Sequence, residues 1–132
     1  MADIKVVCHL LINNAPLIAV VPAAKIYSGV IPQGTPVPAI SISHVSTVRR
    51  HPVAGTATEL CTARVQVTAQ AASYTQQKSV LALVRGALPR TRGTVNGIVV
   101  DSLMHEIDGP DFRDDDAGIF MGSVDYIVKF IE

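Results

Sequence analysis

The sequence predicts an α+β fold, in which a mainly antiparallel sheet of about four to five strands carries two helices packed on one face. Apolar residues recur at helical spacing in two segments, 3–12 and 73–88, whereas apolar and polar residues alternate in segments such as 61–71. The connections between neighbouring strands are short enough for antiparallel pairing. A chain of 132 residues has the size of one ordinary domain, so we expect a single domain over 1–132.

The first helix is predicted after Asp3, which stands in a favourable N-cap position. Its apolar face consists of Ile4, Val7, Cys8, Leu11 and Ile12. The pattern stops at Asn13, and residues 15–20 have room for a short helical turn before Pro22, because proline lacks an amide donor.

Three strands are predicted next. Residues 25–31 form a short strand, a loop with three prolines follows over 32–38, and residues 39–48 alternate as a half-buried strand. A polar segment over 49–59 then precedes the clearest strand, 61–71, in which every second residue is apolar. One face of that strand packs, and the other is solvated or contacts a partner.

The second helix begins at Ser73, which has the spacing of a capping box with Gln76. It carries one apolar stripe over residues 80–88 and stops at Pro89. Two further strands, 97–107 and 119–131, complete the sheet and are joined by an Asp-rich loop at 108–116.

Composition excludes several classes of function. Eleven Lys and Arg balance eleven Asp and Glu, so no long-range field draws in nucleic acid or an anionic membrane. The amino-terminal segment lacks the basic start of an export signal, and no apolar run is long enough to span a membrane. Cys8 and Cys61 lack the spacing of a metal site or redox pair. We therefore expect no specific nucleic-acid recognition and no membrane association.

A search for chemistry gives no coherent site. The carboxylates of 108–116 are oxygen ligands of the kind that Ca²⁺ and Mg²⁺ prefer, but their spacing does not fit an EF-hand loop, and a solvated loop explains them better. No phosphate-binding glycine motif occurs, and no nucleophile stands beside a base in a recognisable motif. The prediction is a non-enzymatic protein without catalytic, cofactor-binding or metal-binding residues. A small metal-dependent hydrolase is the less favoured alternative.

Charged residues are unevenly distributed within this neutral chain. Basic residues gather in two predicted loops, at Arg49, Arg50, Arg90 and Arg92, and acidic residues gather in a third, at Asp108, Asp111, Asp114, Asp115 and Asp116. In a head-to-tail ring, a patch on one subunit meets a different patch on the next, so these residues are candidates for self-association. Separate solvated loops are the alternative, because exposed ion pairs are individually weak.

The segment 25–38, Lys-Ile-Tyr-Ser-Gly-Val-Ile-Pro-Gln-Gly-Thr-Pro-Val-Pro, resembles the R-I-Y-x-G-x-x-P-Q-G-x-x-x-P segment of phage tail completion (tail terminator) proteins, which join siphophage-type tails to heads. The segments 64–67, 84–88 and 118–126 resemble the family's strand, helix and closing strand in the same order. The resemblance covers nearly the whole chain. Lys25 stands where arginine is usual, and Ala39 stands where an aromatic residue is often found.

The resemblance implies a structural subunit with a tail-terminator-like fold. Six such subunits form a homohexameric ring that caps the tail tube, stops its polymerisation and forms part of the head-tail joint. The implied partners are further copies of the chain, the tail tube protein and a head connector or neck protein. The implied location is the tail or neck of the virion, after assembly in the cytoplasm of the bacterial host. Another neck component, such as a head completion or adaptor protein, remains the alternative.

Overall fold

The computed structural model describes residues 2–32, 34–50, 59–115 and 118–131. The helices are α1 (Ala2–Ile12), α2 (Ala15–Ile18) and α3 (Tyr74–Ala87), with a 3₁₀ turn at Ala23–Lys25. The strands are β1 (Ile26–Ser28), β2 (Ala39–Arg50), β3 (Leu60–Ala71), β4 (Thr91–Val95), β5 (Ile98–Asp114) and β6 (Ile119–Ile131).

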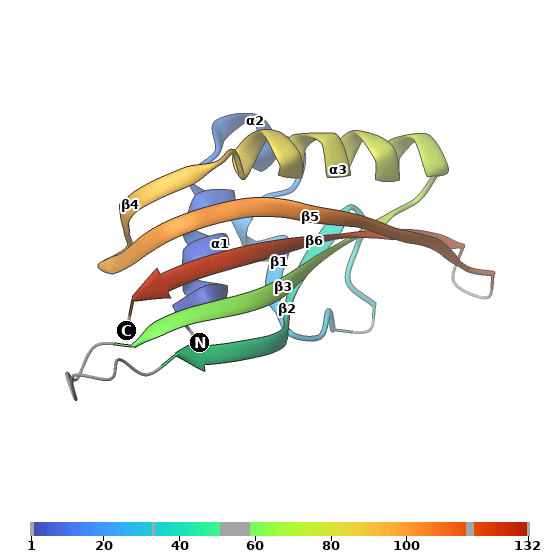
Figure 1. The fold of residues 1–132 in the computed structure, drawn as a ribbon. Coiled ribbons are helices and arrows are strands. Elements are labelled where there is room, and N and C mark those ends of the chain that lie inside the picture. Colours follow the sequence, from blue (N-terminus) through green and yellow to red (C-terminus); the bar gives the residue numbers. More distant parts are fainter. Residues whose placement is uncertain (1, 33, 51–58, 116–117, 132) are drawn as a thin grey trace.

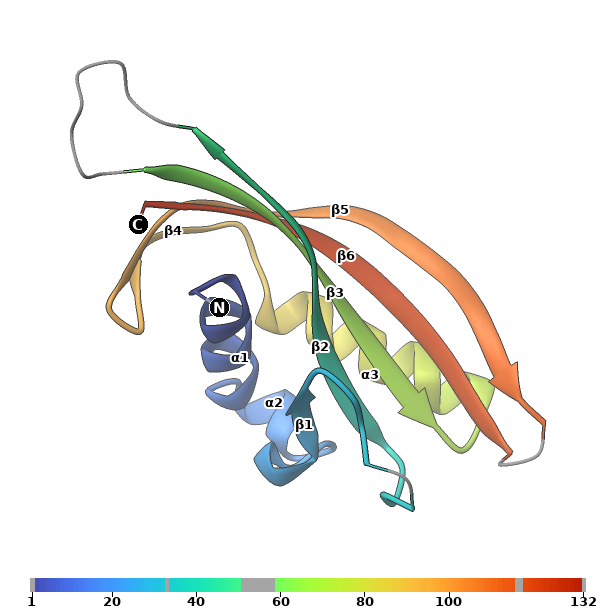
Figure 2. The same ribbon diagram turned by 90° about the horizontal axis from the view of Figure 1, so that it is seen from below.

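The strands form one sheet in the order β1-β2-β3-β6-β5-β4 (Figure 1). The sheet curls along its strands, and the helices lie inside the curve (Figure 2). The α+β class is confirmed. Within the described residues, however, the sheet has six strands and three helices accompany it, where about four to five strands and two helices were predicted. The sheet is also mixed, because β1 pairs with β2 in parallel while the other pairs are antiparallel.

The regular alternation of β3 explains its central place. Cys61, Ala63, Val65, Val67, Ala69 and Ala71 are all buried beneath the helices. The residues between them pair with β2 on one side and β6 on the other, and they are partly exposed on the convex face. On β6 the buried set Val124, Tyr126, Val128 and Phe130 continues the same core.

Helix α3 begins as its capping signal predicts. The Ser73 hydroxyl accepts a hydrogen bond from the amide of Gln76, and the Gln76 side chain accepts one from the amide of Ala72. The helix packs across β3 and β6. Gln77, which is fully buried, lies over Gly122 of β6, where a Cβ atom would come within 2.2 Å of the Gln77 Nε2. A glycine at this position therefore permits the close approach of helix and strand.

Four details differ from the prediction. Asp3 is not the N-cap of α1, because it lies inside the helix and its buried carboxylate contacts His44 of β2. Strand β4 was not predicted. The supposed Asp-rich loop is mostly strand, since β5 continues to Asp114, and β2 continues through Arg49 and Arg50 into the segment predicted to be loop.

Candidate interaction surfaces

Arg49 and Arg50 end strand β2, opposite Cys61 and Leu60 of β3. The Nη1 of Arg49 lies 3.3 Å from the Sγ of Cys61 and 3.5 Å from the Oε2 of Glu59. Arg50 is exposed at the tip of the strand. Both residues are strand residues, so the prediction that they stand in a loop is wrong.

Arg90 and Arg92 lie at the start of β4, on the opposite edge of the sheet. Both are exposed, and they line a small surface hollow together with Asp101 and Leu103 of β5. The Nη2 of Arg90 lies 3.4 Å from the Sδ of Met104. Arg92 therefore lies in strand β4, where the prediction of a loop is wrong, whereas Arg90 lies in the connection between α3 and β4, as the sequence indicated.

The acidic residues extend along β5 and the turn after it. Asp108 accepts a hydrogen bond from the Nε2 of His105 at 3.0 Å. Asp114 is the last residue of the strand, and Asp115 in the turn lies 3.0 Å from the Nε of Arg113. Asp116 lies outside the described residues.

Asp111 is held by helix α3. Its carboxylate accepts hydrogen bonds from the Lys78 ammonium at 3.0 Å, from the Tyr74 hydroxyl at 3.0 Å and from the Gln77 amide at 3.4 Å. The hydrogen bond from Lys78 lowers the pKa of Asp111 below its ordinary value, and the same contact raises the pKa of Lys78. Asp111, one of the residues predicted to take part in self-association, therefore already has hydrogen-bond partners within its own subunit.

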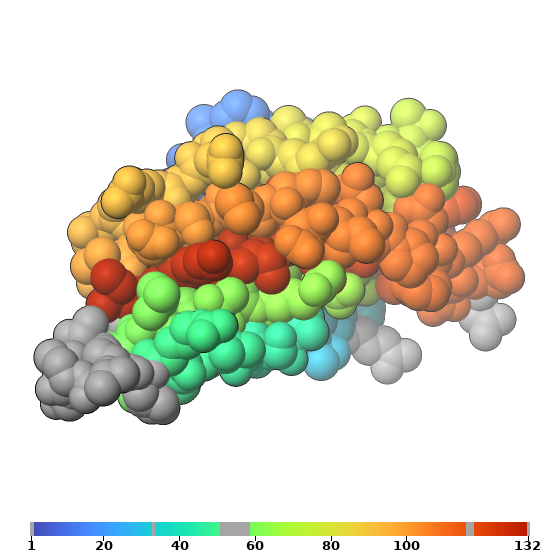
Figure 3. Space-filling model, in the orientation of Figure 1, coloured from blue at the N-terminus to red at the C-terminus, as the bar shows by residue number. Residues whose placement is uncertain are grey.

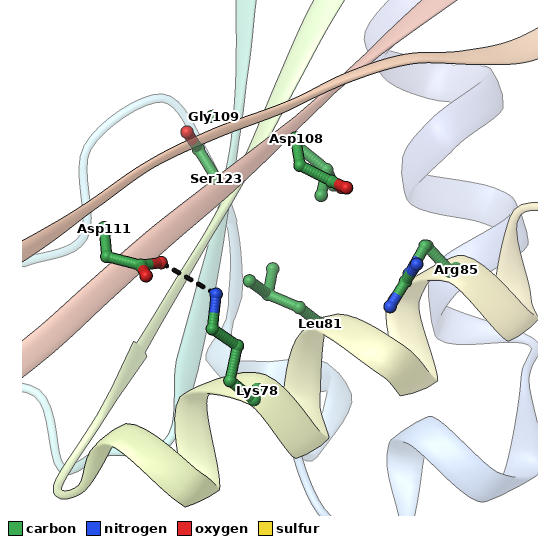
Figure 4. A pocket seen from close by; sticks show the side chains of 8 residues that line it. Lys78, Leu81, Arg85, Asp108, Gly109, Asp111 and Ser123 are labelled. Atoms are coloured by element: carbon green, nitrogen blue, oxygen red, sulfur yellow. Dashed lines mark hydrogen bonds and ion pairs between the residues drawn. The ribbon is translucent and has the colours of Figure 1, made fainter.

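A hollow of about 150 Å³ lies beside this contact, between α3 and the strands β5 and β6 (Figure 4). Lys78, Arg85, Asp108 and Asp111 bring charges of both signs to its wall. Because both signs occur together, the hollow has no clear preference for an anion or a cation. The hydrogen bonds of Asp111 at its edge hold β5 against α3.

The strand register places Arg49 and Arg50 toward one end of the sheet and the acidic residues toward the other. Arg49 is level with Phe130 of β6, which pairs in turn with Val100 near the start of β5. Asp111 is level with Gly122, near the start of β6. Arg49 and Arg50 therefore lie at the end of the sheet where β2 finishes, and the acidic residues lie toward the end where β5 finishes (Figure 1). Arg90 lies nearer the middle of β5, beside Met104.

The convex face of the sheet carries exposed apolar residues that sequence reasoning missed. The side of the molecule away from the helices shows β5, β6, β3 and β2 side by side (Figure 3). Val48 lies opposite Thr62, Ile107 opposite Asp125, and Phe112 opposite Met121, all on this face. These three apolar side chains are more than half exposed. In the sequence, the signal for this surface was Phe112 itself, an aromatic residue within an acidic segment.

The described part of the chain contains no candidate metal site. No group of three or more His, Cys, Asp or Glu side chains in residues 2–32, 34–50, 59–115 and 118–131 could hold a metal ion. Within the same residues, no helix has both the length and the apolar character needed to cross a membrane.

Comparisons with known proteins point to one family. The model of the family described as "Tail completion protein gp17" matches residues 5–130. No curated protein matches the chain by sequence. Among solved structures, a chain from the "Virion of native gene transfer agent (GTA) particle" is similar, with a TM-score of 0.69 and 14% identity over 96% of this chain and 92% of that chain. At that identity the structural likeness concerns the fold.

Proposed function

The chain belongs to the tail completion protein gp17 family, and on that premise we propose that it caps the end of a phage tail tube as a homohexameric ring. The ring stops further polymerisation of the tube and forms part of the head-tail joint. Membership of the family makes the chain a phage structural protein, and it argues for a mechanical rather than an enzymatic role.

One observation carries the proposal: the family match extends over nearly the whole chain, from residue 5 in α1 to residue 130 in β6. The geometry is compatible with a ring. A head-to-tail ring needs two different surfaces on each subunit, and the basic and acidic ends of the sheet are two such surfaces. They lie far apart along β5 and β6, so one subunit can contact two neighbours at once.

The mechanism is interface geometry. One face of the ring binds the last layer of the tube protein, and the closed ring leaves no site for another layer. The opposite face then offers a docking surface to the head connector. Contact energy comes from shape complementarity and burial of apolar surface, with charges setting the register. The assembled particle holds the ring in its tail or neck, after assembly in the bacterial cytoplasm.

Negative-stain microscopy of the purified protein mixed with tail tubes tests the proposal. We expect rings at tube ends, and we expect capped tubes to keep their length when more tube protein is added. Bare tube ends, with the protein bound only to isolated connectors, would instead assign the chain to the head side of the joint.

A further inference from the structure

Two long strands, β2 and β5, have no neighbouring strand along much of their outer edge within the described residues. Strand β1 accompanies β2 only as far as Ile42, so residues 43–50 have no outer neighbouring strand there. Strand β4 accompanies β5 only as far as Leu103, so residues 104–114 likewise have no outer neighbour in the described part. Unpaired amides and carbonyls at a strand edge can pair with another chain.

The directions of these edges suit antiparallel pairing between copies. Strands β2, β3, β6 and β5 alternate in direction across the sheet, so the two outer long strands, β2 and β5, run oppositely. Copies related by rotation about an axis roughly along the strands would bring β2 of one beside β5 of the next. The joined strands would then be antiparallel, like those within each subunit.

The charges of the two edges are complementary. Residues 45–50 of β2 contain two arginines and no acidic residue. Residues 104–114 of β5 contain four acidic residues and a single arginine. Pairing of unlike edges is therefore favoured, and pairing of β5 with β5 brings carboxylates together.

Both edges also expose apolar side chains on the same face of the sheet. Val48 on β2 is 58% exposed, and Ile107 and Phe112 on β5 are 51% and 58% exposed. Side chains directly opposite each other on paired strands lie about 5 Å apart, so joining the edges would cover these residues against one another. A surface that is exposed in the monomer becomes covered in the assembly.

We infer that the subunits of the ring are joined by β-sheet pairing, in which the free half of β2 on one copy adds to the free half of β5 on the next. This inference rests on the proposed ring. It makes the sheet continuous from subunit to subunit. Because the two free halves lie at opposite ends of the sheet, neighbouring sheets are offset along the strands, which is the stagger that a closed barrel of tilted strands requires.

The edge of β5 restricts where this pairing occurs. Pro110 has no amide hydrogen, and the register of β5 against β6 shifts between Asp108 and Asp111. The available edge is thus divided into two stretches, 104–107 and 111–114. A probe at Ile107 therefore tests the first stretch, and a probe at Phe112 tests the second.

Cysteine cross-linking tests the contact. In a Cys8→Ser background, Val48→Cys is combined with either Ile107→Cys or Phe112→Cys, and the protein is oxidised after assembly on tail tubes. At least one double variant should give a ladder of covalent oligomers on a non-reducing gel. The control combines Val48→Cys with Val30→Cys, which is 87% exposed but not on β5, and it should remain monomeric.

Single variants and microscopy separate the outcomes. Covalent dimers from Val48→Cys alone would indicate a two-fold contact and overturn the inference. Tube caps without any ladder from either double variant would overturn the edge pairing but leave the proposed function intact. Protection of residues 104–114 from hydrogen exchange without a ladder would assign that edge to the tube protein. Absence of caps with wild-type protein would overturn the proposed function itself.

Discussion

His44 on β2 and Asp3 on α1 connect the first helix to the sheet, with the Nδ1 of His44 2.5 Å from the Oδ2 of Asp3. The Asp3 side chain is 1% exposed, while that of His44 is 43% exposed. Burial raises the pKa of Asp3, but hydrogen bonds from His44 and from the amide of Ile4 lower it, and the net shift is downward. The folded protein thus keeps this carboxylate ionised more readily than the unfolded chain does.

The first prediction concerns stability in acid. Because folding lowers the pKa of Asp3 below its ordinary 3.8, its ionised form stabilises the fold above about pH 4. That stabilisation is lost as the pH falls through the folded value. We expect Asp3→Asn to lower the neutral-pH stability by about 1 kcal/mol and to flatten the fall in Tm below about pH 4. Asp101→Asn, at an exposed position of β5, is the control. Parallel acid curves for wild type and Asp3→Asn would contradict the assignment.

The second prediction concerns the contact between Gln77 and Gly122. A Cβ at position 122 would lie 2.2 Å from the Nε2 and 2.8 Å from the Cδ of Gln77, which is fully buried. We expect Gly122→Ala to destabilise the protein by about 1–3 kcal/mol in denaturant unfolding, because the packed side chain must shift.

Two variants define this effect. Gly86→Ala, on α3 with open space around its Cβ, should be neutral or stabilising by up to about 1 kcal/mol. Adding Gln77→Ala to Gly122→Ala should restore part of the loss. Equal effects of alanine at positions 86 and 122 would mean that the close approach is not what limits position 122.

The third prediction concerns the start of α3. Ser73→Ala removes the hydroxyl that accepts from the Gln76 amide at 3.1 Å, so we expect a loss of about 1 kcal/mol in thermal or denaturant unfolding. Ser79→Ala, at an exposed position inside the same helix, should cost nothing, because alanine favours a helix interior. If the two substitutions behaved alike, the cap would contribute no measurable stability.

Elements whose signals are local were predictable from the sequence. Strand β3 was found to within one residue because its alternation continues unbroken between two paired neighbours. The start of α3 was found because Ser73 and Gln76 complete their hydrogen bonds within a few residues. The family resemblance was confirmed by a match that covers residues 5–130.

Elements that depend on distant partners were missed. Strand β4 is short and polar, so only its pairing with β5 defines it. The carboxylates near Pro110 are typical of a turn, yet Asp111 is held in strand β5 by side chains of α3 more than thirty residues earlier. Asp3 has a partner 41 positions away, which no capping rule predicts. The charged residues were visible in the sequence, but the free edges depend on where β1 and β4 end.

The last prediction concerns the charges at the two ends of the sheet. Reversing Arg49 and Arg50 to glutamate places like charges opposite the acidic edge of the next subunit. Each exposed pair contributes only about 0.2–1 kcal/mol, but the contact recurs around the ring. We therefore expect the double variant to lose assembly at concentrations where wild type forms rings, as measured by light scattering and by the fraction of capped tubes.

Compensation and controls show whether this loss is specific. Adding Asp114→Lys and Asp115→Lys should partly restore assembly, because the contact is then reversed on both sides. Two variants act as controls. Arg50→Glu alone leaves the internal ion pair of Arg49 with Glu59 intact. Lys5→Glu on α1 makes the same change in net charge as Arg50→Glu, but away from both ends of the sheet. Wild-type assembly should weaken with added salt, since screening acts on exposed charges. An unchanged assembled size in the Arg49 and Arg50 double variant would refute the charge contact, and the sheet edges would then hold the ring by backbone pairing and apolar burial alone.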